Sequence, residues 1–433
     1  MTPIDSGKNT LTFKRITSQI KSKSNYFSYS VLGSIILFFK QLVYSQYLGV
    51  VEFGFYSIFL LTFAYGSYSM GLGFNQGLLR FLPEARLQEK ERYVNVIRNN
   101  VITASLIIGV IEAIIFIPAT FLFVEDSRLS FVLIYAIIYT IINMQINLYT
   151  IDFIGKCQFS LYSKLHFFRA FFLFFGGGVF LALGYGLFTM LLLEILISLT
   201  TLYLIKRFYI VKARYQFDNI NVVFGIMKKG IGFWGVDVVK GLLSSLDKIV
   251  IVSFFPMVII GSYSFSMIIF TISVVASGIL STLLKPLFIN KLSKTGSKIE
   301  IFHSTLTISL IILIIGAIIG GILLNVFEWA ILNYYPEYKI GASYLLPIII
   351  SCIFFIANIY ESALLAFDAG RSFFKLNFQI CMVYIFIVAI SITQNAEIFF
   401  YLYLFTFVQL LLLIMNFLLT RKIAYKDVKI KVL

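Results

Sequence analysis

The sequence has 433 residues, of which 60% are hydrophobic and 13% are charged, and its formal net charge is +15. An apolar share of this size, about 260 residues, exceeds what soluble domains carry, so the composition excludes a water-soluble protein. Because one membrane-spanning helix uses about 20 apolar residues, the chain can supply about twelve spans once loops are allowed for. Three cysteines and two histidines are too few for a disulfide scaffold or a histidine-based metal site. We therefore expect no metal and no cofactor.

The apolar runs divide the chain into two halves. A basic arm comes first, followed by six apolar stretches of helical length at 26–46, 54–79, 101–124, 130–151, 167–183 and 187–205. After a basic linker, six more stretches lie at 231–255, 258–284, 304–326, 341–367, 376–392 and 398–420. The sequence predicts an all-α integral membrane protein with about twelve transmembrane helices, in an N-terminal lobe (1–207) and a C-terminal lobe (208–433).

The distribution of basic residues orients these spans. With the amino terminus placed inside, 30 of the 35 Lys and Arg residues fall in segments assigned to the cytoplasm, Arg98 and Arg169 among them. This asymmetry is what the positive-inside rule requires, and it predicts that both termini are cytoplasmic. The net charge is therefore a signal of topology, and we expect no nucleic-acid partner.

A short internal repeat links the two halves. Residues 54–57 read GFYS and residues 261–264 read GSYS, at an offset of 207 residues. Six spans in each half would give both halves the same orientation, related by a pseudo-twofold axis along the membrane normal. The shared residues are few, so a chance match is the alternative.

Three segments carry a resemblance to a known family: 49–57 (GVVEFGFYS), 71–84 (GLGFNQGLLRFLPE) and 247–251 (DKIVI). With them, the chain resembles the Wzx-type polysaccharide (O-antigen) flippases, within the multidrug, oligosaccharidyl-lipid and polysaccharide exporter superfamily. The resemblance implies two six-helix lobes around a central cavity that opens alternately to each side of the bacterial inner membrane. It also implies a substrate, an undecaprenyl-pyrophosphate-linked oligosaccharide moved from the cytoplasmic to the periplasmic leaflet for O-antigen, capsule or exopolysaccharide synthesis.

The same resemblance implies a lipid-embedded transporter and not an enzyme. Its expected partners are the bilayer, the lipid-linked substrate, and the polysaccharide polymerase and chain-length machinery of lipopolysaccharide biosynthesis. We expect the transporter to act as a monomer.

Charged residues inside the spans are the main candidates for function, because each costs about 2.5–3.5 kcal/mol at a helix centre on insertion scales. Spacings of three and four residues place a polar stripe on one face of the seventh span: Asp237, Lys240, Ser244, Asp247 and Lys248. A weaker stripe on the first span includes Lys40, Gln41 and Tyr44. We interpret both as lining a shared lumen.

The functional hypothesis is that Lys40, Lys240 and Lys248 bind the pyrophosphate, with Arg80 meeting it after the second span. A phosphate group needs cations because its desolvation is otherwise prohibitive. The alternative is that the charges only neutralise one another, Asp237 with Lys240 and Asp247 with a lysine across the cavity.

Three further carboxylates lie in spans and have no partner on their own helices: Glu112, Glu194 and Glu361. Carboxyl groups in such places often relay protons, so we consider them candidates for a proton-coupled step. The alternative is a hydrogen-bonded residue that holds helices together.

Two other functions fit part of the pattern. A multidrug exporter of the same superfamily is the main alternative, but its cavity would favour acids for cationic drugs. A membrane polysaccharide polymerase or ligase would need external catalytic residues, and the external turns here are short. No phosphate-binding glycine loop with its Lys and Ser/Thr is present, which argues against an ATP-driven pump.

Overall fold

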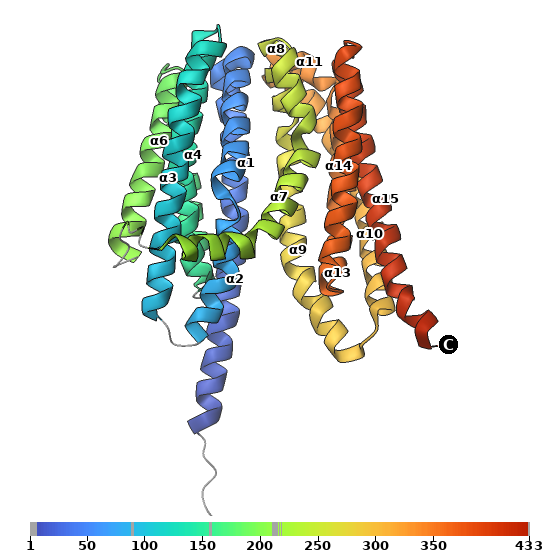
Figure 1. Ribbon diagram of the computed structural model, residues 1–433. Helices are drawn as coiled ribbons and strands as arrows, with labels where there is room; N and C mark the ends of the chain where they lie inside the picture. Colours follow the sequence, from blue (N-terminus) through green and yellow to red (C-terminus); the bar gives the residue numbers. More distant parts are fainter. Residues whose placement is uncertain are drawn as a thin grey trace, which may run out of the picture. The chain divides into compact units, whose positions relative to one another are not determined.

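The computed structural model describes residues 7–87, 91–155, 158–209, 215, 217 and 219–431. Its regular elements are all helical: α1 (Gly7–Gly71), α2 (Phe74–Leu87), α3 (Glu91–Phe123), α4 (Ser127–Gly155), α5 (Phe159–Ala182), α6 (Leu187–Leu204), η1 (Ile205–Tyr209), α7 (Ile220–Phe254), α8 (Met257–Ser266), α9 (Ile268–Thr295), α10 (Lys298–Tyr334), η2 (Pro336–Tyr338), α11 (Lys339–Ala342), α12 (Leu345–Ala357), α13 (Tyr360–Ala366), α14 (Gly370–Thr393) and α15 (Ile398–Lys431). Among the described residues there is no strand, as the sequence predicts (Figure 1).

The predicted spans all lie in these helices. Ten helical stretches of the described residues are long and apolar enough to cross a membrane. The first of them, Ser28–Gly71, holds two predicted spans because the backbone of Gly49 breaks it with φ 71° and ψ 172°. The ten stretches therefore contain eleven predicted spans. Helix α7 is not among the ten because it carries too many charged residues, and it is the twelfth span predicted from sequence. The protein is a multi-pass membrane protein.

The outer side of the helices supports this conclusion. On α10, the exposed side chains form an apolar row with a spacing of about four residues: Leu310, Ile311, Ile314, Ile315, Ile318, Ile319 and Ile322. A row of this kind would be unfavourable in water and is typical of a helix that faces lipid.

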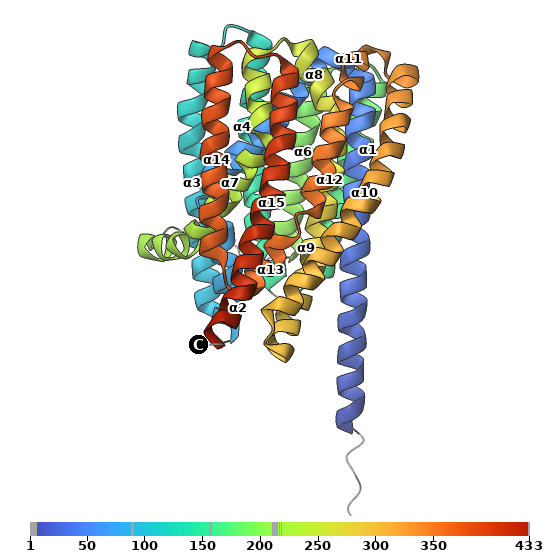
Figure 2. The ribbon, with the colours of Figure 1, turned by 90° about the vertical axis from the view of Figure 1, so that its right-hand side faces the viewer.

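The chain divides into two compact units. Unit 1 comprises residues up to Leu48 together with Ile58–Gly235, and within it α4 packs against α2, α3, α5 and α6. Unit 2 comprises Gly49–Ser57 and Val236–Leu433, and within it α12 packs against α9, α10 and α15 (Figure 2). The boundary proposed from sequence between two lobes at residue 207 stays a prediction.

The two repeat segments contact each other inside unit 2. A Cβ atom on Gly54 would lie 2.8 Å from the carbonyl oxygen of Met257, and one on Gly261 would overlap the carbonyl oxygen of Val50. Both Val50 to Met257 and Gly54 to Gly261 are separated by 207 residues, so the contact is reciprocal. Glycine is required at this crossing because the two helix backbones touch. A repeat at this offset explains why both copies keep the glycine.

We predict that Gly261→Ala lowers the melting temperature of the purified protein, since the added methyl group overlaps a backbone oxygen and overpacking costs about 1–3 kcal/mol. Gly321→Ala is the matched control, because no atom lies within 4 Å of the position its Cβ would take. Thermal unfolding in detergent, followed by intrinsic fluorescence, measures both. Equal melting of Gly261→Ala and wild type would contradict the close crossing.

Candidate functional site

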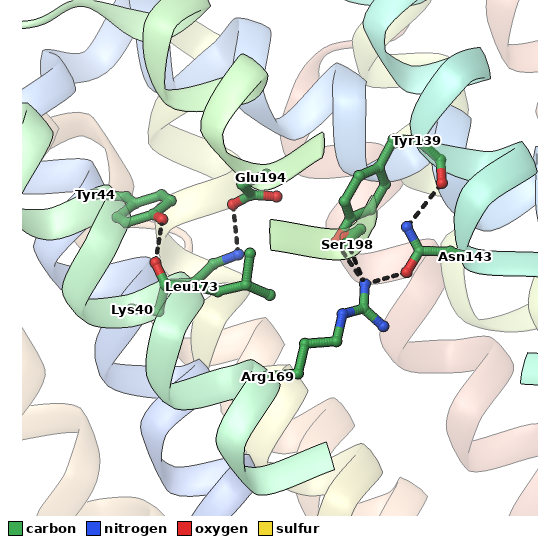
Figure 3. Close-up of polar contacts among 8 residues, drawn as sticks. All are labelled: Lys40, Tyr44, Tyr139, Asn143, Arg169, Leu173, Glu194 and Ser198. Carbon is green, nitrogen blue, oxygen red and sulfur yellow. Dashed lines mark hydrogen bonds and ion pairs between the residues drawn. The ribbon is translucent and has the colours of Figure 1, made fainter. Parts of the chain in front are cut away.

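A polar cluster occupies the interior of unit 1, where four helices each contribute two residues spaced four apart. Because such residues lie on one face of a helix, each helix turns a single face toward the cluster. The contributors are Lys40 and Tyr44 from α1, Tyr139 and Asn143 from α4, Arg169 and Leu173 from α5, and Glu194 and Ser198 from α6 (Figure 3).

Lys40 is held in a buried ion pair. Its Nζ atom lies 2.7 Å from Oε1 of Glu194, and the two side chains are 7% and 1% exposed. The ammonium also lies 5.1 Å from the ring centroid of Tyr44, whose hydroxyl donates to the carbonyl oxygen of Leu173 at 2.7 Å. The sequence predicted functional roles for Lys40 and Glu194 separately, and the structure brings them together. This geometry fits the neutralising alternative better than an open phosphate site.

Two arginines that the sequence assigned to cytoplasmic segments lie instead within helical stretches of unit 1 that are long and apolar enough to cross a membrane. Arg98 is 3% exposed, and its Nη1 lies 3.6 Å from Oδ2 of the buried Asp152. Arg169 lies ten residues into α5, where Nη2 donates to Asn143 Oδ1, to Tyr139 OH at 3.1 Å and to Ser198 Oγ at 3.3 Å. The prediction was wrong because α5 begins at Phe159, whereas the hydropathy placed the start of the span near residue 167.

In unit 2, Lys240 of α7 pairs with Glu361 of α13. Their side chains keep 35% and 31% of their surface exposed, and the ammonium lies 5.4 Å from the ring centroid of Phe373. The sequence alternative paired Lys240 with Asp237 on the same helix; the observed partner comes from another helix. Unlike the Lys40 pair, the Lys240 pair keeps about a third of its side-chain surface accessible.

The remaining charges of α7 have different surroundings. Asp247 is fully buried and accepts a hydrogen bond from the hydroxyl of Tyr263, which comes from α8. The sequence alternative expected a lysine across a cavity as the partner of Asp247; the observed partner is a tyrosine. Lys248 is half-buried, and none of the described acids lies within ion-pair distance of its ammonium.

Three predicted site residues have little defined chemistry. Glu112 is half-buried on α3 and accepts a hydrogen bond from Ser69 Oγ at 3.0 Å. Gln41 is half-buried on α1. Arg80 lies on α2, and its side chain is outside the described residues.

The structure adds an apolar cavity that sequence reasoning missed. It has a volume of about 280 Å³ and lies in unit 2 among α9, α10 and α12. Ile272, Ile315, Ile319, Ile349 and Ile353 contribute to its wall. No pattern in the sequence distinguishes these isoleucines from the many that face lipid.

Comparison with solved structures finds a similar fold in several proteins whose titles name them transporters or a flippase. The lipid II flippase MurJ in an inward closed conformation aligns with a TM-score of 0.72 and 12% identity, over 92% of this chain and 87% of that chain. An outward-facing MATE family transporter of the MOP superfamily aligns with a TM-score of 0.62 and 14% identity, over 92% and 95%. The MATE transporter VcmN of Vibrio cholerae gives 0.60 and 14%, over 95% and 98%.

At these identities the likeness concerns the fold. It agrees with the predicted architecture of about twelve helices. No protein-family model matches the sequence, and no curated protein matches it.

We predict that Lys40→Met destabilises the protein strongly, because it leaves the Glu194 carboxylate buried without its cation. Removing one partner of a buried pair costs about 3–5 kcal/mol, whereas an apolar replacement of both is tolerated far better. The double variant Lys40→Met/Glu194→Leu should therefore recover much of the loss in a thermal-unfolding cycle. If Lys40→Met melts with the wild type, the pair does not hold the cluster together.

Proposed function

We propose that this protein is a transporter of the MOP superfamily that moves undecaprenyl-pyrophosphate-linked oligosaccharides across the bacterial cytoplasmic membrane. It would carry them from the cytoplasmic to the periplasmic leaflet by alternating access, for synthesis of a surface polysaccharide such as O-antigen. On this proposal the protein performs no covalent chemistry.

The observation that carries the proposal is the half-exposed ion pair of Lys240 and Glu361. A charge within a membrane-spanning segment is expensive and is generally retained for function. Here about a third of each side chain stays accessible, so the ammonium can exchange its carboxylate for a phosphate oxygen without being newly uncovered. A charge-assisted hydrogen bond to phosphate is about as favourable as the one it replaces.

The apolar half of such a substrate also needs a place. Undecaprenyl is a long hydrocarbon, and the cavity of unit 2 has an almost wholly apolar lining and membrane-facing isoleucines around it. The likeness to MurJ, whose name says that it flips lipid II, supports a lipid-linked substrate.

A multidrug exporter is the second candidate, supported by the likeness to several MATE transporters. A cationic drug needs an accessible acid that no protein cation already neutralises. Within the described spans, Glu194 and Glu361 are paired with lysines and Asp152 faces Arg98. Glu112, whose observed hydrogen-bond partner is Ser69, is one acid on which this alternative can rest.

We predict that Lys240→Gln reduces translocation of the lipid-linked oligosaccharide by about tenfold or more in proteoliposomes. The loss of one charge-assisted hydrogen bond, about 1.5–3 kcal/mol, corresponds to that factor. The assay follows labelled substrate as it becomes accessible to a sugar-modifying enzyme on the far side of the vesicle. Lys339→Gln, which removes the same charge from an exposed position outside the spans, should leave the rate unchanged.

Two results would contradict the proposal. One is a normal rate for Lys240→Gln at equal protein content, which would remove the substrate role of Lys240. The other is transport of a cationic dye by wild type, abolished in Glu112→Gln, without any flipping of the lipid-linked sugar, which would establish drug export.

A further inference from the structure

Arg169 brings a positive charge into unit 1, and no acid among the described residues pairs with it. Its guanidinium contacts only neutral oxygens, those of Tyr139, Asn143 and Ser198, and its Cζ lies 5.9 Å from the ring centroid of Tyr139. In the described part of the chain no carboxylate lies within ion-pair distance of it. Such isolation is unusual in a membrane-spanning helix, where a buried charge normally has a partner of opposite sign.

The neighbouring charges do not remove this excess. Lys40 and Glu194 cancel each other at 2.7 Å, and Arg98 faces Asp152 at 3.6 Å. The polar cluster that contains Arg169 therefore keeps one uncompensated positive charge.

One donor of the guanidinium is also unsatisfied. The Nε atom of Arg169 is buried and has no hydrogen-bond partner in the described structure. A buried N–H left unpaired costs about 1–3 kcal/mol, and more on a charged group. Groups of this kind in folded proteins generally indicate a bound water or ion.

A small pocket with a mixed polar and apolar lining lies beside the Arg169 side chain. Arg169 forms part of its wall, together with Asn147, Thr150, Tyr162, His166 and Thr201. The pocket has a volume of about 30 Å³. A cavity needs roughly 10–15 Å³ to hold one water, so this one accepts a water or a monatomic ion and is too small for a phosphate or a pyrophosphate.

The wall of the pocket is built for an anion and not for a cation. It contains a guanidinium, an imidazole, an amide and hydroxyl groups but no carboxylate. Ile205, the residue at which α6 gives way to the π-helical turn η1, also lines the pocket. Single π turns of this kind are frequent at functional sites.

We propose that the pocket beside Arg169 binds one monovalent anion of about the size of chloride. The anion contacts the Arg169 side chain that lines the pocket and compensates the excess charge of the polar cluster. It therefore completes the interior of unit 1, and the site is separate from Lys240 and independent of which substrate the protein transports.

Purified protein in detergent tests the proposal through its thermal stability. At constant ionic strength, replacing gluconate by chloride should raise the melting temperature of wild type by a few degrees along a saturable curve, because an ion that binds only the folded state stabilises it. Arg169→Gln should lose the saturable rise. Arg128→Gln removes the same charge from an exposed position in the first turn of α4 and should keep it. A rise that is equal in Arg169→Gln and wild type would overturn the proposal.

If Arg169→Gln does not fold, anomalous diffraction from bromide tests the proposal with the wild-type protein alone. Crystals grown with bromide as the only halide should give an anomalous peak in the pocket, in contact with the Arg169 side chain. A pocket that holds water and no anomalous peak, or a melting temperature that is the same in chloride and gluconate, would show that no anion binds. The oligosaccharide translocation assay does not enter this test, so the two proposals fail separately.

Discussion

The structure depends on one constraint: a charge placed in a membrane-spanning helix is costly unless groups from another helix contact it. Residues on the same helix can reach each other only at spacings of three or four, and those positions point toward one face. In both units the observed solution is a lysine on one helix and a glutamate on another, Lys40 with Glu194 and Lys240 with Glu361. Each pair fixes how two helices meet, because moving either helix would separate the charges.

Close backbone contact provides the complementary restraint. In lipid, the hydrophobic effect does not drive helices together. Close packing at small residues and polar contacts between helices stabilise their association instead. The reciprocal approach of Gly54 and Gly261 is of the first kind. The hydrogen bonds from Arg169 to α4 and α6 are of the second kind. Unit 1 is thus held by polar contacts in its interior, while the glycine crossing in unit 2 requires the absence of side chains.

The sequence was sufficient for the span count because a run of about 20 apolar residues is a local property. It also identified the charged residues, since an intramembrane Lys or Glu stands out in such a run. It could not pair them: Lys240 has Asp237 three positions away, yet its partner is Glu361, 121 residues later in the chain. Arg169 was misplaced because Ser160, Ser163 and Lys164 lower the hydropathy of the first turns of α5, which nevertheless continue the helix. Residues from three helices line the small pocket beside Arg169, so no local sequence pattern predicts it.

The two lysine pairs differ in a way that bears on function. A pair that is 7% and 1% exposed has exchanged nearly all its water for contacts within the protein, so leaving either ion without its partner is costly. The pair that is 35% and 31% exposed stays accessible from outside the pair, so a competing anion can approach the lysine before the carboxylate leaves. If α1 and α7 descend from one repeat, a lysine–glutamate pair has a different role in each unit. The pair in unit 1 is buried and stabilises the structure. The pair in unit 2 stays accessible and can bind a substrate.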